Sequence, residues 1–280
     1  MLFDTHTHLE SFTHRGVLPE TLSSARSAGV EAMVTIGTSP DDWSLYRGIA
    51  NQNAGFIYYS AGLHPCAVDA GWAEAVGKLE GFWQRDVAEG LDGNYPAPVA
   101  LGEIGLDRFH LPKDDSAAAD RIFAEQRAAF AEGLAIARRL KCPVVIHSRG
   151  AFTDCVEMID QSGVNWTKVV FHCFTEGEAE MDELIRRGAW ASFTGIITYK
   201  NAESVRAAAR RQGLERLMIE TDAPYLTPLP FRGKPNEPAF LRHTAEYIAA
   251  NVFGVPLENL AEITTRNARA FFGIEHASRT

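Results

Sequence analysis

The 280-residue chain has few cysteines, no excess of positive charge and no long apolar run. Its four cysteines contain no C-x-x-C pair, which gives no sign of a disulfide framework or a thiolate zinc site and favours reduced thiols in a cytoplasmic protein. No run is apolar for long enough to cross a bilayer and no signal peptide is recognisable, so we expect no membrane interaction. The formal net charge of −9 argues against capture of nucleic acid by the whole surface. It allows a local cationic site, since bound divalent ions would add positive charge.

Length and composition are those of a soluble globular protein. Hydrophobic residues make up 46% of the chain and charged residues 22%. This length fits two small domains or one α/β barrel. Because no linker, internal repeat or low-complexity tract interrupts the sequence, we predict one domain over residues 1–280. We also expect the protein to be a monomer.

Short β-like runs alternate with longer helical segments. Strands are predicted at residues 2–8, 30–37, 56–63, 99–104, 143–147, 168–174, 190–194 and 217–221. Helices are predicted at residues 19–28, 41–51, 72–89, 117–141, 152–162, 178–187, 202–212, 239–251 and 257–272, and loops at 90–98 and 224–238. Eight strands followed by helices predict an α/β protein with a parallel (β/α)8 TIM barrel. An open doubly wound sheet is the alternative, but no glycine-rich phosphate fingerprint follows the first strand.

Ionisable residues gather at the ends of these strands. His6 and His8 are two positions apart in the first strand, so their side chains point to the same side. A single His-x-His pair is weak evidence of a metal site, because a lone histidine after a strand is more often structural. Five further residues follow apolar strand residues: His64, Glu103, His147, His172 and Asp222. In a (β/α)8 barrel these ends share one face, where so many ionisable groups would be costly to bury without a counter-ion.

These residues suit a centre for two divalent ions. Glu103 is the candidate bridge, because a bridging carboxylate needs two oxygens between ions about 3.5–4 Å apart. One ion would be bound by His6, His8, Glu103 and Asp222, and the other by Glu103, His147 and His172. Open positions would then remain for water and substrate, which is typical of catalysis. The imidazole-rich set favours Zn²⁺ or Mn²⁺ over Mg²⁺.

Two of the strand-end residues have predicted catalytic roles besides Glu103. Asp222 would accept a proton from the attacking water, because it ends the eighth strand beside the first ion. His64 would hold the substrate or the leaving oxygen, with a structural His-Pro turn as an equal alternative. Glu220 and Asp4 share the strand parity of Asp222 and His6, and we interpret them as residues that support the ligands by hydrogen bonds.

The sequence resembles the TatD family of metal-dependent deoxyribonucleases, within the amidohydrolase-like barrels, over almost its whole length. The matching segments are Asp4-Thr5-His6-Thr7-His8-Leu9, Gly62-Leu63-His64-Pro65, Gly102-Glu103-Ile104-Gly105-Leu106-Asp107, Pro143-Val144-Val145-Ile146-His147-Ser148-Arg149, His172-Cys173-Phe174, Glu220-Thr221-Asp222-Ala223-Pro224-Tyr225-Leu226 and Arg232-Gly233-Lys234-Pro235-Asn236. The resemblance implies the two-metal assignment, phosphodiester hydrolysis and 3′-to-5′ exonuclease action on single-stranded DNA.

The chain departs from the family pattern at two places. Arg108-Phe109-His110 stands where the family has an aromatic pair, and Thr175-Glu176-Gly177 where it has Ser/Thr-Gly. A carboxylate from Glu176 would disfavour a phosphate if it pointed into the site. These changes affect the expected substrate preference and leave the metal site as predicted.

Four residues are candidates to bind substrate phosphate. Arg149 lies two positions beyond His147 and shares its face if the strand continues, where its guanidinium can bind phosphate with two hydrogen bonds. Arg232, Lys234 and Asn236 lie in the loop after the eighth strand, a common phosphate-binding position in this fold. A surface salt bridge is the alternative for Arg149 and a solvated basic turn for Lys234, whereas Arg232 is a stronger candidate through the motif that resembles the family. Lys200 is a weaker candidate, and we interpret His14, His110, His243 and His276 as surface or packing residues.

Two other functions stay open. The same centre could hydrolyse another ester or amide bond, such as the ester of an aminoacyl-tRNA or a lactone. A non-catalytic metal-binding partner protein is the third hypothesis, against which the open coordination positions argue.

Overall fold

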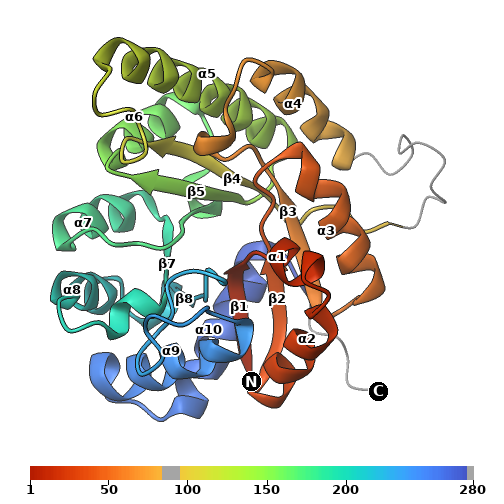
Figure 1. Cartoon of the computed structure of the whole chain (residues 1–280). Coiled ribbons are helices and arrows are strands. Elements are labelled where there is room, and N and C mark those ends of the chain that lie inside the picture. The colour runs from red at the N-terminus through yellow and green to blue at the C-terminus, as the bar shows by residue number, and fades with distance from the viewer. Residues whose placement is uncertain (84–94, 276–280) are drawn as a thin grey trace. The chain divides into compact units, whose positions relative to one another are not determined.

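The computed structural model describes residues 1–83 and 95–275, with eight strands close to the predicted positions (Figure 1). The strands are β1 Leu2–Thr7, β2 Val30–Thr35, β3 Ile57–Ala61, β4 Ala100–Asp107, β5 Val144–Arg149, β6 Val169–Phe171, β7 Trp190–Phe193 and β8 Leu217–Ile219. They follow one another in the sheet in chain order, and the described strand pairs are parallel. This order confirms the (β/α)8 prediction, since a doubly wound sheet reverses its strand order at a switch point.

The helices also follow the prediction, with three differences. They are α1 Glu10–His14, α2 Leu18–Ser27, α3 Pro40–Gln52, α4 Trp72–Lys78, α5 Ser116–Leu140, α6 Phe152–Ser162, α7 Glu178–Arg187, α8 Glu203–Gln212, α9 Leu241–Tyr247 and α10 Leu257–Phe272. The short α1 was not predicted. The helix predicted at 72–89 changes to a 3-10 turn, Leu79–Phe82, and residues 84–89, like 90–94 of the following loop, lie outside the described residues. The helix predicted at 239–251 begins at Leu241 and continues into a π-helical segment, Ile248–Phe253.

The chain groups into two compact units. The first unit comprises residues 1–35, 53–58 and 172–280, and the second comprises residues 36–52 and 59–171. The single domain over residues 1–280 stays a prediction. None of the helices in the described ranges combines the length and the apolar character that a membrane crossing requires.

In the first unit, β1 pairs with β2 and β7 with β8. Helix α10 packs against β1 and β8 (Figure 1). The stacked rings of Phe3 and Phe272, with centroids 6.3 Å apart, form part of this contact. The packing buries the strands and so fixes the end of β1, which carries His6, and the end of β8, after which Asp222 follows.

In the second unit, β4 lies between β3 and β5, and β5 pairs with β6. The long helix α5 packs against β4, where a Cβ on Gly133 would lie 3.1 Å from Ile104. Strand β4 continues to Asp107, three residues beyond its predicted end at 104. This extension brings a second carboxylate onto the face that Glu103 occupies.

Candidate metal centre

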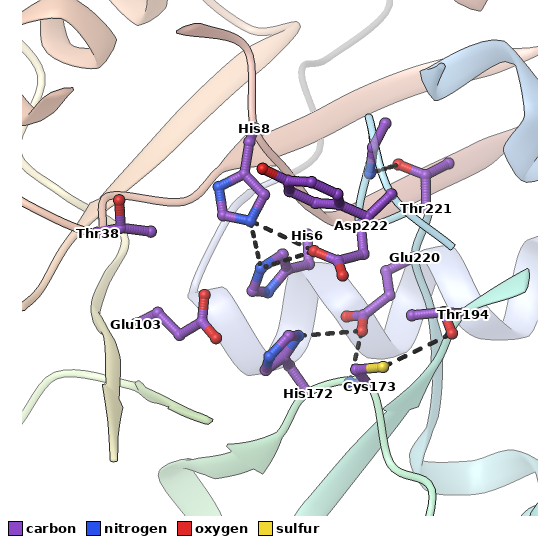
Figure 2. A network of polar contacts seen from close by, with 12 residues as sticks. His6, His8, Thr38, Glu103, His172, Cys173, Thr194, Glu220, Thr221 and Asp222 are labelled. Atoms are coloured by element: carbon purple, nitrogen blue, oxygen red, sulfur yellow. Dashed lines mark hydrogen bonds and ion pairs between the residues drawn. The ribbon is translucent and has the colours of Figure 1, made fainter. Parts of the chain in front are cut away.

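In the first unit, His6, His8 and Asp222 direct three ligand atoms at one another (Figure 2). The two Nε2 atoms are 3.3 Å apart, and Asp222 Oδ1 is 3.5 Å from His6 Nε2 and 3.3 Å from His8 Nε2. Ligands bound tetrahedrally at about 2.0–2.1 Å from one ion are separated by about 3.3 Å. These residues therefore fit a divalent ion in both chemistry and spacing.

Two backbone hydrogen bonds, one donated from each side, connect the end of β1 to the turn after β8. The Asp222 N–H donates to the His6 carbonyl at 2.8 Å, and the His8 N–H donates to the Ala223 carbonyl at 2.8 Å. Asp222 has a left-handed backbone with φ of 54°, which turns its side chain back toward the histidines. Burial raises the pKa of Asp222, but the hydrogen bond from His8 and the charges of His6 and His172 outweigh it, so the pKa lies below its ordinary value. The carboxyl is therefore ionised at neutral pH and can bind a cation.

His172 lies beside this group and is oriented by Glu220. Its ring stacks on His6, with centroids 3.9 Å apart, and its Nδ1 is 3.4 Å from Glu220 Oε1. The same oxygen accepts the Cys173 N–H at 2.6 Å, and the other carboxylate oxygen accepts hydroxyls from Ser192 and Thr5. Figure 2 shows Glu220 between His172 and Cys173. Glu220 therefore fixes the turn that carries His172, as predicted for a supporting residue.

Asp4 supports the other side of the same strand ends. Its carboxylate accepts the Thr221 N–H at 2.9 Å and the Thr221 hydroxyl at 2.6 Å, and it also accepts the His6 N–H at 3.3 Å. Burial raises the pKa of Asp4 to about 7, against the lowering effect of these hydrogen bonds. Asp4 therefore ties β1 to the turn that positions Asp222.

In the second unit, His64, Glu103 and His147 form another set of ligand atoms. His147 Nδ1 is 2.8 Å from Glu103 Oε1 and 3.1 Å from His64 Nε2, and His64 Nε2 is 3.5 Å from Glu103 Oε1. His64 Nδ1 accepts the Cys66 N–H at 3.0 Å, so its Nε2 carries the hydrogen of the neutral ring. His64 can therefore donate a hydrogen bond through Nε2, and its contact to substrate stays a prediction.

Asp107 is a residue of this site that the sequence analysis did not identify. Its Oδ2 lies 3.0 Å from His147 Nε2, so the imidazole stands between two carboxylates, Asp107 and Glu103. Gly105, midway between them in β4, pairs with His147 of β5. Gly105 has a φ of +146°, and a Cβ there would lie 2.0 Å from the His147 carbonyl oxygen, so only glycine allows this approach.

Two carboxylates on one imidazole favour positive charge between them. Burial opposes ionisation of Asp107, but hydrogen bonds from His147 and His110 hold its pKa well below the usual range. With Nε2–H directed at Asp107, the His147 Nδ1 lone pair is left to accept the His64 Nε2–H at 3.1 Å or to bind a metal ion together with Glu103. The second set therefore also fits a divalent ion, held by Glu103 and His147.

The predicted phosphate-binding residues have different surroundings. Arg149 and Arg232 are exposed, and each guanidinium carbon lies 4.2 Å from an aromatic ring centroid, of Phe109 and Tyr199 respectively. Lys234 is exposed, with Nζ 5.5 Å from the Phe231 ring. By contrast, Asn236 is buried. Its amide group donates to the carbonyls of Thr221 and Tyr225 at 2.9 and 2.6 Å, so its side chain holds the loop in shape.

Other predicted residues stay outside the two sets. Glu176 is partly buried, and burial together with the charge of Glu180 raises its pKa. His243 lies 3.7 Å from Glu246 at the surface, and His14 ends α1. His276 lies outside the described residues. His110, interpreted as a surface or packing residue, contacts Asp107 through Nδ1 at 2.8 Å and so lies next to the second set.

Comparison with known proteins gives relatives over the full length of the chain. A family model described as TatD related DNase matches residues 3–273. The metal-dependent hydrolase YcfH of Escherichia coli (strain K12) is 33% identical over 281 residues, which cover 99% of this chain and 97% of that protein. The 3′-5′ ssDNA/RNA exonuclease TatD of Erwinia amylovora is 31% identical over 281 residues, which cover 98% of this chain and 100% of that protein. The crystal structure of YJJV, a TatD homologue from Escherichia coli K12, superposes with a TM-score of 0.84 at 24% identity and covers 98% of both chains.

Proposed function

Because the chain belongs to the TatD family of metal-dependent hydrolases, we propose that it hydrolyses phosphodiester bonds from the 3′ end of single-stranded DNA. The observation that carries this proposal is the presence of two sets of imidazole and carboxylate ligand atoms. The first set has the spacing of ligands on one ion, and the second brings an imidazole and a carboxylate within 2.8 Å, a hydrogen-bond distance that an ion would widen. The residues of both sets lie in barrel strands or in the turns that follow them. The Erwinia amylovora relative, named a 3′-5′ ssDNA/RNA exonuclease, supports the choice of substrate and direction.

Two divalent ions, Zn²⁺, Mn²⁺ or Mg²⁺, are the proposed cofactors. His6, His8 and Asp222 would hold the first, and Glu103 and His147 the second, with His172 as a further ligand and Glu103 as the bridge. When bound, such ions supply Lewis-acid stabilisation of negative charge on phosphate oxygens and lower the pKa of a coordinated water. The bridging role of Glu103 is a proposal that stands on its two carboxylate oxygens and on the shared face of strand ends in this fold.

The side chains themselves supply proton transfer and orientation. Asp222 is ionised, because its histidine neighbours lower its pKa, and it can accept the proton of the attacking water. His64 directs its Nε2–H away from the Cys66 amide and can donate to an oxygen of the substrate. Glu220 holds the turn of His172 by accepting the N–H of the next residue, Cys173, and lies 3.4 Å from the His172 ring, while Asp107 lies 3.0 Å from His147 Nε2.

Two arginines supported by aromatic rings are proposed to bind the nucleic acid. A guanidinium stacked on a ring keeps its plane fixed while its N–H groups remain available for a phosphate. Arg149 has this arrangement with Phe109, whose side chain is 53% exposed, and Arg232 has it with Tyr199. An exposed ring also offers a surface on which a base can stack, which suits single-stranded ends. Lys234 would add positive charge without a fixed orientation.

The test is digestion of a single-stranded oligonucleotide labelled at its 5′ end, with Mg²⁺, Mn²⁺ or Zn²⁺ returned to the metal-free protein. We expect a ladder of products that shorten from the 3′ end and a block by phosphorothioate linkages at that end. Asp222→Asn should abolish the ladder, while Asp120→Asn, an exposed carboxylate on α5, should leave it unchanged. Full turnover by Asp222→Asn would remove that residue from its proton-accepting role. Hydrolysis of a charged tRNA or a lactone without any cutting of DNA would replace the nuclease proposal by one of the other hydrolase reactions.

A further inference from the structure

Beside the second set of ligand atoms, three residues of different chemistry converge. Cys66 Sγ is 3.6 Å from Asp107 Oδ2 and 3.7 Å from His110 Nδ1, and that Nδ1 is 2.8 Å from the same Asp107 oxygen. Thiol, carboxylate and imidazole are three ligand types that zinc binds in proteins. None of the roles proposed above uses Cys66 or His110.

The spacing of these atoms matches a single ion. A tetrahedral zinc with a sulfur at about 2.3 Å and a nitrogen or oxygen at about 2.0–2.1 Å places the sulfur about 3.5 Å from either light atom. The two observed sulfur distances, 3.6 and 3.7 Å, lie close to that value. The nitrogen–oxygen separation of 2.8 Å is that of a hydrogen bond and would open by about 0.5 Å when an ion replaces the hydrogen. A half-exposed imidazole can make this shift by a small rotation.

The local backbone holds the three residues together. Cys66 lies in the 3-10 turn Pro65–Ala67 directly after His64, and Asp107 ends β4. The His110 N–H donates to Asp107 Oδ1 at 2.9 Å, which fixes the turn from 107 to 110. Asp107 is fully buried, whereas the thiol is exposed and the His110 side chain is 52% exposed. An ion can therefore enter from solvent and be anchored by a buried carboxylate.

We propose that Cys66, Asp107 and His110 form a third metal site, for a thiophilic divalent ion such as Zn²⁺, separate from the two proposed catalytic ions. On binding, the sulfur–metal bond forms and the thiol proton is released to solvent. Thiolate ligands select zinc over Mg²⁺ and Mn²⁺. The third site should therefore bind zinc selectively, whereas the two sets of histidine and carboxylate ligands suit all three ions.

The site also has a consequence for activity, which rests on the proposed function. Asp107 Oδ2 is shared between His110 at 2.8 Å and His147 at 3.0 Å. An ion that takes this oxygen withdraws it from His147, and carboxylates that support a metal-bound histidine are worth about 10- to 100-fold in affinity. Zinc in excess should therefore inhibit the enzyme by weakening the metal held by His147.

Cobalt substitution reports the site directly, because a thiolate bound to Co²⁺ gives a sulfur-to-metal charge-transfer band and none of the proposed catalytic ligands is a sulfur. When the wild-type protein is titrated with Co²⁺, this band should develop as the third equivalent binds, after the two proposed catalytic ions. Cys66→Ser should lose the band, His110→Ala should lose it or bind Co²⁺ far more weakly, and Cys173→Ser, a control thiol beside His172, should keep it. Absence of the band from the wild type, or its persistence in Cys66→Ser, would overturn the proposal.

A second measurement uses the unaltered protein, so that misfolding of a variant cannot obscure the result. Cd²⁺ or Zn²⁺ should protect Cys66 from alkylation by iodoacetamide, read by mass spectrometry of its peptide, and Mg²⁺ should not. Equal alkylation with and without Cd²⁺ would contradict the site. In the activity assay, Cys66→Ser should need about tenfold more zinc than the wild type for half-inhibition. If protection occurs but both proteins respond equally to zinc, the metal site stands and its inhibitory role is refuted.

Discussion

Replacing Asp107 by Asn tests how the second set of ligands is held. Asp107 Oδ2 accepts from His147 Nε2 at 3.0 Å and from His110 Nδ1 at 2.8 Å, while Oδ1 accepts the His110 N–H at 2.9 Å. An asparagine has one acceptor oxygen and an NH2 group, so at least one of these donors would face another donor. If the NH2 faces His147 Nε2, the imidazole must place its hydrogen on Nδ1, which then cannot bind a metal.

The expected size of the effect follows from burial and from the number of lost bonds. Asp107 is fully buried, and a buried donor left without a partner costs about 1–3 kcal/mol of stability. Loss of a carboxylate that supports a metal-bound histidine lowers metal affinity by about 10- to 100-fold, equal to about 1.4–2.8 kcal/mol. We therefore expect Asp107→Asn to bind the ion held by His147 at least tenfold less tightly than the wild type.

Titration calorimetry with Mn²⁺ measures this change, because Mn²⁺ has little affinity for thiolate and so avoids Cys66. Asp120→Asn is the matched control, since it makes the same chemical change at an exposed position of α5. Thermal unfolding of each metal-free protein separates loss of stability from loss of binding. Mn²⁺ affinity within twofold of the wild type in a folded Asp107→Asn would refute the role assigned to this carboxylate.

Three further changes have defined outcomes. Arg149→Ala and Arg232→Ala should each raise KM for an oligonucleotide by about 1.5- to 5-fold, which corresponds to the energy of an exposed ion pair, and should leave the metal content unchanged. KM values equal to that of the wild type would show that neither arginine binds the substrate. Asn236→Ala should lower the free energy of unfolding by about 1–3 kcal/mol in a denaturant titration, because the buried carbonyl of Thr221 and the part-buried carbonyl of Tyr225 lose their donor. Unaltered stability would show that the loop does not depend on the amide. Glu176→Gln should raise the melting temperature at neutral pH, because burial and a neighbouring glutamate raise the pKa of Glu176. Ionisation of this carboxyl therefore destabilises the fold, an effect that begins above the unfolded-state pKa and is complete above the folded-state pKa. That gain should disappear as the pH falls to about 3, below the ordinary glutamate pKa of about 4.3, where the carboxyl is protonated in both states, and a gain that persists there would have another cause.

The sequence allowed most of the fold to be predicted because its signals are local. Apolar strand segments and amphipathic helical segments indicated the eight strand–helix units, and glycines with left-handed backbones, such as Gly188 after α7, indicated helix ends. The short helix α1 was missed because it is five residues long and follows directly on the His6–His8 strand. Packing, rather than periodicity, determines elements of that length.

The candidate site was predictable where strand parity applies and was missed where the backbone leaves the strand. Parity placed His6 and His8 on one side, and their Nε2 atoms lie 3.3 Å apart. Asp107 was missed because the predicted fourth strand ended at 104, although residues 103, 105 and 107 share one parity in the strand that forms. Asp222 adopts a positive φ, which only the folded turn after β8 reveals.

The Cys66 cluster illustrates a second limit of sequence reasoning. Cys66 and Asp107 are 41 positions apart and belong to no spaced cysteine motif, so the composition indicated no thiolate site. The turn after His64 and the end of β4 bring them to 3.6 Å. His110 was an unexplained departure from the family pattern until its imidazole was found on the same carboxylate.

The most direct test of the account is the metal content of the wild type and of Glu103→Ala, measured by mass spectrometry of the metals after dialysis against Mn²⁺. The wild type should retain two ions per chain and cut single-stranded DNA. Glu103→Ala should lose both ions, because the bridging carboxylate is gone, and should be inactive while its circular dichroism spectrum stays that of the folded protein. Retention of two ions by Glu103→Ala would contradict the bridged centre from which the proposed function is built.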